Sequence, residues 1–512
     1  MWDDILPYLR KKGLSVVHGQ CTSVGVSGFS LHGGVHFGGL SELYGLASDN
    51  ILSLKAVIAN GSMVELTNSS CYMNAKGVDY HECNGLWFSL RGAGSSFAVV
   101  TELTIQLHRL PSTFKSSLSI FQVMVSSSTN ASRYIDTFIN SVPSEVSLTF
   151  FGLDAYFKAF LFVLKFIKSN ERKRALHHGM SRLLGTKTRK GSDYVYFVVE
   201  ATWVAEGDDG GNDDIYGDKI GNLLSKIHDK IVQGNIYAHG DLAIDMPLPF
   251  LYTDRTWSVP SYDLVWGSGH AYGGASITTG AAGSESVLQA LMQRFHSHLM
   301  LSRSSKRAAS HCSDCVVVLH RVGDGLASRT SSSSSSSSSF NPLRTNSTLW
   351  AEVDCGLFYR KLRNWPMCSR WIDDTQLVLD QAVEKRNHSA FHYPNVPNLV
   401  TENWGEMYYG KDTYNRLLEE KRIWDKKNLF NHVQSIGSAQ RKKDIINNDL
   451  IEHAHLCNKA YKWRGLRDLR LGITIISGFF FLRSIYSGAR RLIHQLLTSR
   501  KCDTSTSTSS SM

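Results

Sequence analysis

The chain has 512 residues, enough for two or three domains. Hydrophobic residues make up 42% of the chain and charged residues 20%, which excludes a wholly disordered chain, a collagen and a protein that crosses a membrane many times. The formal net charge is +10, but most of it lies between Asn458 and Lys501, where ten Lys/Arg accompany a single acid. A basic tail on a nearly neutral body is not a basic binding face, so we expect no nucleic-acid partner.

Nine cysteines occur at irregular spacing, and such an odd set does not indicate a disulfide framework. Cys312 and Cys315 are close together, but no second pair accompanies them, and we predict no metal site. Met1 is followed at once by Trp2-Asp3-Asp4, so no N-terminal signal peptide is predicted. Five Asn-x-Ser/Thr sequons would nevertheless suit a secreted protein, and the compartment stays open.

The first part of the chain is rich in glycine and predicts short strands joined by tight turns. Residues 54–59 and 62–66 are predicted to be two strands around the hairpin turn Asn60-Gly61. Residues 97–107 predict a long strand, which ends before Pro111.

Strands and helices are mixed from about residue 115 to residue 390. The hydrophobic pattern predicts strands over 194–203 and 315–319 and helices over 221–232 and 284–300. Two segments look inserted, a helix over 156–174 and a serine run over 331–339 that we expect to be a disordered loop. The chain begins with strands, continues with mixed strands and helices, and is expected to return to the first domain near its end. This order predicts an α+β fold in two domains.

The densest signal is a glycine-rich stretch that runs from Gly19 to Ile51. Glycines of this kind mark a close approach of the backbone, either to another backbone or to a ligand. Successive backbone N–H groups in such a loop can bind a phosphate or a polarised ring carbonyl. The spacing alone does not decide between strand packing and ligand binding.

Two sets of motifs resemble one protein family. The first set is G-x-C-x-x-V-G-x-x-G at residues 19–28, His32-Gly-Gly34, Tyr44-Gly-Leu-Ala-Ser-Asp-Asn50 and residues 86–97. The second set includes Phe391-His-Tyr-Pro-Asn395, Tyr408-Tyr-Gly410 and Asn428-Leu-Phe430. In this order they resemble the berberine-bridge-enzyme-like oxidases of the vanillyl-alcohol-oxidase superfamily, whose FAD domain is of the PCMH type.

The resemblance implies FAD as the cofactor and gives roles to individual residues. Cys21 matches a cysteine that many family members link covalently to the flavin ring, and a small buried cysteine in a packed loop is the alternative interpretation. Further positions match residues whose backbones contact the cofactor in the family, although each could instead serve turn or strand packing: Val24, Gly25, Gly28, Asn50, Ile51, Val99 and Val100.

Tyr393 and Asn395 match a pair that reaches the flavin from the second domain. The resemblance implies that Tyr393 is catalytic, and that it hydrogen-bonds or helps to deprotonate a substrate hydroxyl as hydride leaves the neighbouring carbon. An aromatic side chain packed on the core is the alternative. His32, His36 and Arg91 are expected to be structural.

The activity that the resemblance implies is that of an FAD-dependent oxidoreductase. Hydride would pass from a C–H bond next to a hydroxyl or amine to flavin N5, with O₂ as the electron acceptor. The substrate would be a small molecule, such as a sugar, an alcohol or an alkaloid. No acidic base within 113–390 matches a motif that we can identify.

One departure from the family lies at the start. Family members carry a further stretch before the position of Met1, which includes the glycine-rich loop for the cofactor's pyrophosphate. Residues 1–112 are therefore predicted to be the second half of an FAD-binding domain of the PCMH type. The chain would then be either an incomplete product of a longer gene or a degenerate, non-catalytic member that acts as a membrane-associated binding or scaffold protein.

Three regions are expected to follow. Residues 113–390 would form a substrate domain, an antiparallel sheet backed by helices with a serine-rich insertion at 328–348, and residues 391–437 would return to the flavin. Residues 438–512 would form a basic and apolar helical tail that is partly disordered. Within this tail, residues 471–489 are apolar with basic flanks, which predicts either membrane contact or a helix that covers its own domain.

Overall fold

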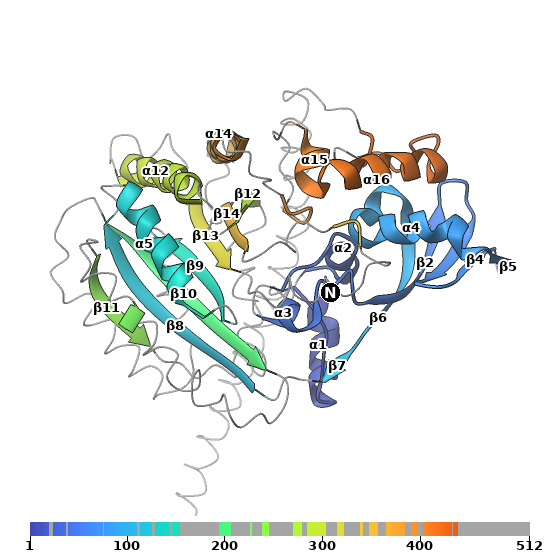
Figure 1. The fold of residues 1–512 in the computed structure, drawn as a ribbon, viewed down its shortest axis with the longest axis horizontal. Coiled ribbons are helices and arrows are strands. Elements are labelled where there is room, and N and C mark those ends of the chain that lie inside the picture. Colours follow the sequence, from blue (N-terminus) through green and yellow to red (C-terminus); the bar gives the residue numbers. More distant parts are fainter. Residues whose placement is uncertain are drawn as a thin grey trace, which may run out of the picture. The chain divides into compact units, whose positions relative to one another are not determined.

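A computed structural model gives the fold as a five-stranded sheet, a seven-stranded sheet, a two-stranded ribbon and the helices that pack on them (Figure 1). The residues that the structure describes are 1–19, 24–36, 39–74, 76–109, 113–124, 128–143, 146–153, 194–205, 226–227, 238–244, 270–278, 284–303, 315–321, 338–340, 348–356, 365–384, 392–396, 401, 403–432 and 434–438. Helices and antiparallel sheets together confirm the predicted α+β class.

The five-stranded sheet is antiparallel, and its strands lie in the order β5-β4-β3-β2-β6. These strands are β2 (Ile51–Ile58), β3 (Met63–Thr67), β4 (Cys71–Met73), β5 (Lys76–Val78) and β6 (Ala98–Ile105). The predicted hairpin is confirmed, because Gly61 has a φ of 84° and the Asn60 side chain accepts a hydrogen bond from the backbone N–H of Ser62. The predicted long strand is β6.

The core of this sheet is completed by helices from distant parts of the sequence. These helices are α4 (Tyr80–Ala93), α15 (Trp404–Tyr409) and α16 (Lys411–Trp424), and Figure 1 shows α4 and α16 side by side. The shared apolar cluster includes Leu54, Leu66, Leu90, Phe97, Tyr408 and Leu417. Burial of this apolar surface brings the last described helices back onto the first sheet.

A second apolar cluster packs around the N-terminal helix. In α1 (Trp2–Lys11), Trp2, Leu6 and Leu9 recur at helical spacing and are buried against Val17 and Phe29. The chain then forms β1 (Leu14–Ser15), which pairs antiparallel with β7 (His108–Arg109), and the short helices α2 (Val26–Leu31) and α3 (Leu40–Tyr44).

The seven-stranded sheet is also antiparallel, with the order β11-β8-β10-β9-β13-β14-β12. Its strands are β8 (Thr113–Met124), β9 (Ser147–Leu153), β10 (Tyr194–Ala205), β11 (Ala238–Ile244), β12 (His270–Thr278), β13 (Cys315–Arg321) and β14 (Thr348–Gly356). Its helices are α5 (Ser128–Ser141), α12 (Ser284–Arg303) and α14 (Trp365–Glu384). The strands predicted at 194–203 and 315–319 and the helix predicted at 284–300 are confirmed.

One face of this sheet lies under α5, where Phe138 and Phe150 meet edge to face at 5.4 Å between ring centroids. The residues on this face are fully buried: Leu148, Phe150, Val199, Ala201, Val317, Leu319, Ala351 and Val353. Because strand side chains alternate, Thr149, His320 and Trp350 lie on the opposite face. Cross-strand pairing places His320 between the other two.

Several predictions fall outside the described residues. They are the helix over 156–174, the helix over 221–232 apart from residues 226–227, and the tail from residue 439 onward, with the apolar stretch 471–489. Within the described ranges, no helix is long and apolar enough to cross a membrane.

The prediction of a disordered serine loop is wrong at its last two residues, since Ser338 and Ser339 are buried. The Ser338 hydroxyl donates to Asp49 Oδ1 at 3.2 Å, and the backbone N–H of Ser339 donates to the Arg91 carbonyl at 2.9 Å. Gly92 leaves the space that Ser339 fills, because a Cβ there would lie 2.4 Å from the Ser339 hydroxyl. Tertiary partners satisfy the polar groups that a serine run cannot satisfy by itself.

A disulfide that the sequence did not predict joins Cys71 of β4 to Cys83 of α4. Both cysteines are buried in the core of the five-stranded sheet. The bridge closes a loop between residues 12 positions apart.

We predict that replacing both cysteines, as Cys71→Ala with Cys83→Ala, lowers the free energy of unfolding by about 3 kcal/mol, because the unfolded chain regains the freedom of the closed loop. Thermal unfolding with and without a reducing agent checks this. Reductant should lower the melting temperature of the wild type more than that of the double variant. Equal responses of the two proteins would contradict the bridge.

Candidate functional site

Tyr393 and Asn395 converge on the glycine-rich loop. The backbone N–H of Val35 donates to Tyr393 Oη at 2.8 Å, and Asn395 Nδ2 donates to the same oxygen at 2.9 Å. Asn395 Nδ2 also lies 3.2 Å from the carbonyl oxygens of Phe29 and His32. The structure therefore brings together the two residues predicted from the C-terminal motif and joins both to the loop.

The loop takes this shape because glycine occupies two left-handed positions, Gly33 with φ 96° and Gly34 with φ 75°. A Cβ on Gly33 would lie 2.4 Å from the ring of Phe340, and one on Gly34 would lie 2.5 Å from Ala47. The carbonyls of both glycines accept hydrogen bonds from residues 47 and 48. Packing and backbone pairing thus fix the position of the Val35 N–H.

Aromatic side chains surround the Tyr393 ring. Phe340 lies 5.4 Å from it between ring centroids, and Trp350 of β14 meets it edge to face at 6.0 Å. Val35 and Leu46 complete this buried cluster. The hydroxyl is thereby removed from water while its oxygen keeps its hydrogen-bond donors.

Burial raises the pKa of Tyr393 to about 12, although the hydrogen bonds from Asn395 and from the Val35 and Gly34 backbone act to lower it and the charge of Glu352 raises it. Tyr393 therefore stays protonated at neutral pH. It can donate a hydrogen bond, but it is not a base under these conditions.

Glu352 is the acidic residue that sequence reasoning missed. It lies two residues after Trp350 on β14 and thus on the same face, and Trp350 Nε1 donates to Glu352 Oε2 at 3.3 Å. The side chain is half-buried. The alternation of Trp350 and Glu352 in a predicted strand could have indicated a shared face, but not that this face meets Tyr393.

His320 lies next to Trp350 in the neighbouring strand β13. Its Nδ1 is 2.9 Å from Thr149 Oγ1, and burial lowers the pKa of His320 to about 3. The imidazole is therefore neutral over the physiological range. On the same face of the sheet, the Ser147 hydroxyl of β9 donates to Glu42 Oε1 of α3. Three separate polar contacts therefore lie on this face, and the one between Ser147 and Glu42 joins the sheet to α3.

The residues predicted to contact a cofactor divide into two groups. In the first group, Gly25 and Gly28 are exposed, and a Cβ on either would find no atom within 4 Å, so the packing of the described residues does not require glycine there. Val24 is partly buried beside them, and Val99 on β6 is 57% exposed. The side chains of these positions are thus exposed or partly exposed, and the packing of the described residues does not explain the two glycines.

The second group is engaged in the fold. Asn50 Nδ2 donates to the carbonyls of Tyr44 and Leu46, each at 2.8 Å, and Asn50 Oδ1 lies 2.6 Å from His108 Nε2. Ile51 is buried in the core of the five-stranded sheet, and Val100 packs against that core. Cys21 lies outside the described residues.

His36 and Arg91 have structural surroundings, as expected. Burial holds the pKa of His36 well below its usual value, and the nearby His18 ring, 4.8 Å away between centroids, lowers it further. Arg91 Nε donates to the Ser48 carbonyl at 3.0 Å, and its guanidinium lies over the Trp87 ring.

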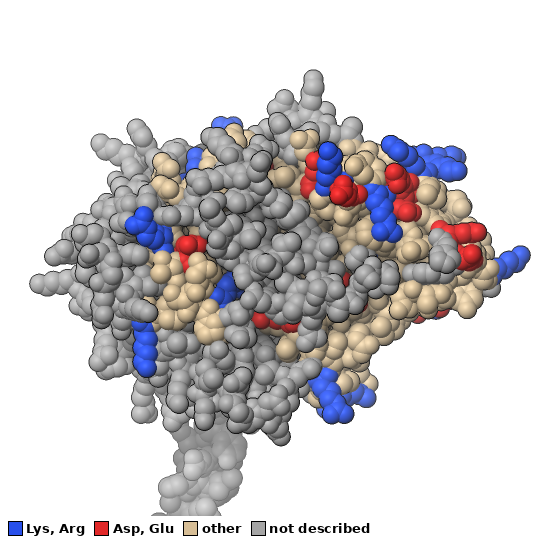
Figure 2. Space-filling view, in the orientation of Figure 1, with Lys and Arg blue, Asp and Glu red and all other residues tan. Residues whose placement is uncertain are grey.

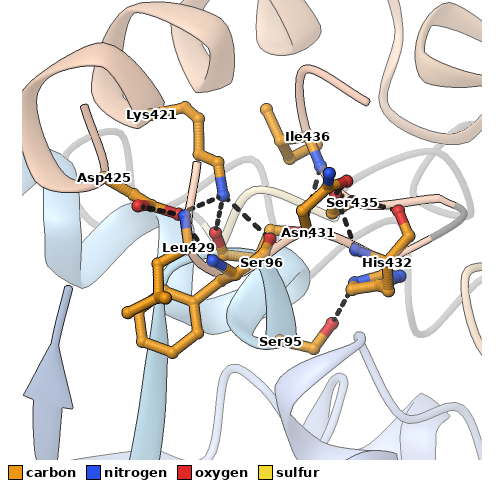
Figure 3. Close-up of polar contacts among 10 residues, drawn as sticks. Ser95, Ser96, Lys421, Asp425, Leu429, Asn431, His432, Ser435 and Ile436 are labelled. Atoms are coloured by element: carbon orange, nitrogen blue, oxygen red, sulfur yellow. Dashed lines mark hydrogen bonds and ion pairs between the residues drawn. The ribbon is translucent and has the colours of Figure 1, made fainter. Parts of the chain in front are cut away.

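A buried lysine anchors the C-terminal segment to the first part of the chain (Figure 3). Lys421 Nζ donates to the Ser96 carbonyl at 2.6 Å, to Asp425 Oδ2 at 2.7 Å and to the Phe430 carbonyl at 3.0 Å. The Asp425 carboxylate also accepts from the backbone N–H groups of Leu429 and Phe430. All three ammonium protons therefore have acceptors.

This segment is also the part of the chain that a family model matches. Residues 392–437 match a family model described as berberine and berberine like. The matched range contains Tyr393, Asn395 and Lys421 and so falls on the residues that build the site. Over these residues the chain is similar to the berberine-like family, and the curated relatives it matches in part include FAD-linked oxidoreductases and oxidases.

Curated relatives match the chain over part of their length. It is 39% identical over 108 residues to (R)-6-hydroxynicotine oxidase from Paenarthrobacter nicotinovorans, which covers 21% of this chain and 20% of that enzyme. It is 40% identical over 94 residues to xylooligosaccharide oxidase from Thermothelomyces thermophilus, which covers 18% of this chain and 16% of that enzyme. The chain therefore spans about a fifth or less of these relatives.

The fold resembles that of berberine bridge enzyme from Eschscholzia californica. The TM-score is 0.53 at 16% identity, over 86% of this chain and 76% of that one. At this level of identity the likeness shows the fold alone.

We predict that Lys421→Met lowers the free energy of unfolding by about 3–5 kcal/mol, because it leaves the buried Asp425 carboxylate without its cation. Chemical denaturation at neutral pH checks this, and Lys426→Met, at an exposed position of the same segment, is the matched control.

Acid should reduce this difference between Lys421→Met and the wild type. Burial acts to raise the pKa of Asp425, but hydrogen bonds from Lys421, Leu429 and Phe430 outweigh it and lower the pKa. A lowered carboxylate pKa contributes stability above its unfolded value of about 4, and this is lost as the pH falls through the folded pKa. If the difference in unfolding free energy between Lys421→Met and the wild type stayed constant down to the folded pKa of Asp425, the ion pair between Lys421 and Asp425 would be contradicted.

Proposed function

We propose that this protein is an FAD-dependent oxidase that takes hydride from a C–H bond next to a hydroxyl or amine of a small molecule, with O₂ as the electron acceptor. The observation that carries the proposal is the buried meeting of Tyr393 with the glycine-rich loop on one side and with the Trp350–Glu352 face of the sheet on the other. The oxidase names of two curated relatives, one acting on a nicotine and one on xylooligosaccharides, support the reaction class.

Gly25, Gly28 and Val99 are exposed and are among the residues that we propose to contact the flavin, Gly25 and Gly28 from the loop that ends at Val35 and Val99 from β6. Cys21, in the same loop sequence, is the residue we propose for a covalent link. When bound, FAD would supply the acceptor for hydride and pass electrons to O₂.

Tyr393 and Glu352 would divide the proton chemistry between them. Tyr393 Oη accepts from Val35 and Asn395 and keeps its own proton at neutral pH, so it would orient the substrate oxygen or nitrogen as a hydrogen-bond donor. Glu352, as a carboxylate, would accept the proton that the substrate hydroxyl or amine loses. The apolar rings of Phe340 and Trp350 would exclude water from this transfer.

The cofactor is tested directly by adding FAD to the purified full chain and removing free FAD by gel filtration. We expect flavin absorbance to stay with the protein, and, if Cys21 forms a covalent link, to stay with the pellet after acid precipitation. A colourless protein after gel filtration would favour a non-catalytic member of the family and overturn the proposal.

The proton roles are tested by Glu352→Gln and Tyr393→Phe in the flavin-loaded protein. With a panel of alcohols, amines and sugars, the rate of flavin bleaching without O₂ should fall by about 100-fold or more in Glu352→Gln, which lacks a base. Tyr393→Phe should reduce the rate while the flavin stays bound. Glu65→Gln and Tyr72→Phe, both exposed on the five-stranded sheet, are matched controls that should behave as the wild type. Full activity of Glu352→Gln would exclude it as the base.

A further inference from the structure

A serine hydroxyl near the site lies between two imidazoles. His32 Nε2 is 2.7 Å from Ser95 Oγ, and His432 Nε2 is 3.1 Å from the same oxygen (the second contact is drawn in Figure 3). His32 directly follows α2, Ser95 lies in the 3-10 turn η1 (Gly94–Ser96), and His432 belongs to the C-terminal segment. Neither the cofactor contacts nor the proton roles proposed above use this group.

The hydrogen-bond partners fix where each proton lies. His32 Nδ1 is 2.9 Å from the Gly28 carbonyl, which can only accept, so Nδ1 carries the proton of the neutral ring. His32 Nε2 is then an acceptor, and the Ser95 hydroxyl donates to it. The Ser95 oxygen in turn accepts from the Nε2–H of His432. The result is a serine aimed at a base, with that base oriented by a backbone carbonyl.

Both histidines are neutral at pH 7. Burial lowers the pKa of His32, although its hydrogen bond to Gly28 acts to raise it. Burial also lowers the pKa of His432, and the repulsion that a protonated His432 would meet from a protonated His32 and from Lys421 lowers it further. The base is therefore in its proton-accepting form over the whole neutral range.

Ser95 is also accessible to a reagent. Its side chain is exposed, as is that of His432, whereas His32 is partly buried behind them. Exposure of the nucleophile with a partly buried base is the arrangement that lets an electrophile approach the oxygen and not the imidazole.

We propose that Ser95 is an activated nucleophile that takes an acyl or phosphonyl group from an activated ester or fluoride, with His32 as its base. In this step a bond forms between Ser95 Oγ and the acyl carbon or the phosphorus. The bond to the leaving group breaks, and the hydroxyl proton passes to His32 Nε2 and from there to the leaving group. No oxidation or reduction takes place, and the hydrogen bond from His432 would hold the Ser95 hydroxyl in the orientation that donates to His32.

The test is labelling of the full chain with a fluorophosphonate probe, followed by mass spectrometry of the tryptic peptide that spans residues 92–109. We expect the label on Ser95 and not on Ser96, whose hydroxyl accepts from the Ile436 N–H. Ser69→Ala, at an exposed serine of the five-stranded sheet, should label like the wild type. An unlabelled Ser95 in the wild type would overturn the proposal and leave these contacts as a latch between the turn and the C-terminal segment.

The role of His32 is tested by the rate of labelling. His32→Gln should slow it by about 100-fold or more, and in the wild type the rate should rise with pH to a plateau with a midpoint below 6.5. Ser95→Ala should abolish the label on this peptide. If that variant fails to fold, Ser95→Cys with iodoacetamide as the reagent replaces it, and His32→Gln should slow its labelling as well. An unchanged labelling rate in folded His32→Gln would contradict the assignment of the base. None of these readouts requires flavin, so they do not depend on the proposed oxidase activity.

Discussion

The return of the C-terminal segment to the glycine-rich loop is the constraint on which the rest of the site depends. Tyr393 Oη, Val35 N–H and Asn395 Nδ2 meet in a space from which water is excluded. Val35 belongs to the loop itself, whereas Tyr393 and Asn395 lie more than 350 residues later in the sequence. An unpaired buried N–H or hydroxyl would cost free energy, so the contact holds both segments in one arrangement.

This contact is held from two sides. On one side Lys421 and Asp425 fasten the segment that follows Tyr393 to the turn at Ser96, and the apolar cluster around Phe97 and Leu417 buries the helices between them. On the other side two aromatic rings pack against the Tyr393 ring. Trp350 belongs to the seven-stranded sheet, and Phe340 directly follows the buried end of the serine run. The site therefore sits on packed elements, although its residues come from loops.

The features that could be predicted from the sequence are those that short local patterns encode. Asn60-Gly61 predicted the hairpin because only such residues adopt its turn easily, and the C-terminal motif predicted that Tyr393 and Asn395 act together. Glu352 was missed because its role depends on the sheet face and on a tyrosine that returns from elsewhere in the chain. Ser338 and Ser339 were misassigned because composition does not reveal the partners that bury them. The pairing of Cys71 with Cys83 likewise depends on how α4 packs on β4.

Hydrogen–deuterium exchange of the full chain, with and without added FAD, tests most directly whether the loop and the returning segment form one flavin site. We expect slower exchange on FAD addition in residues 24–36 and 392–396 together, with no change in the β3–β4 hairpin at residues 63–73. Exchange that is unchanged in both of the first two segments, or slowed only elsewhere, would contradict it.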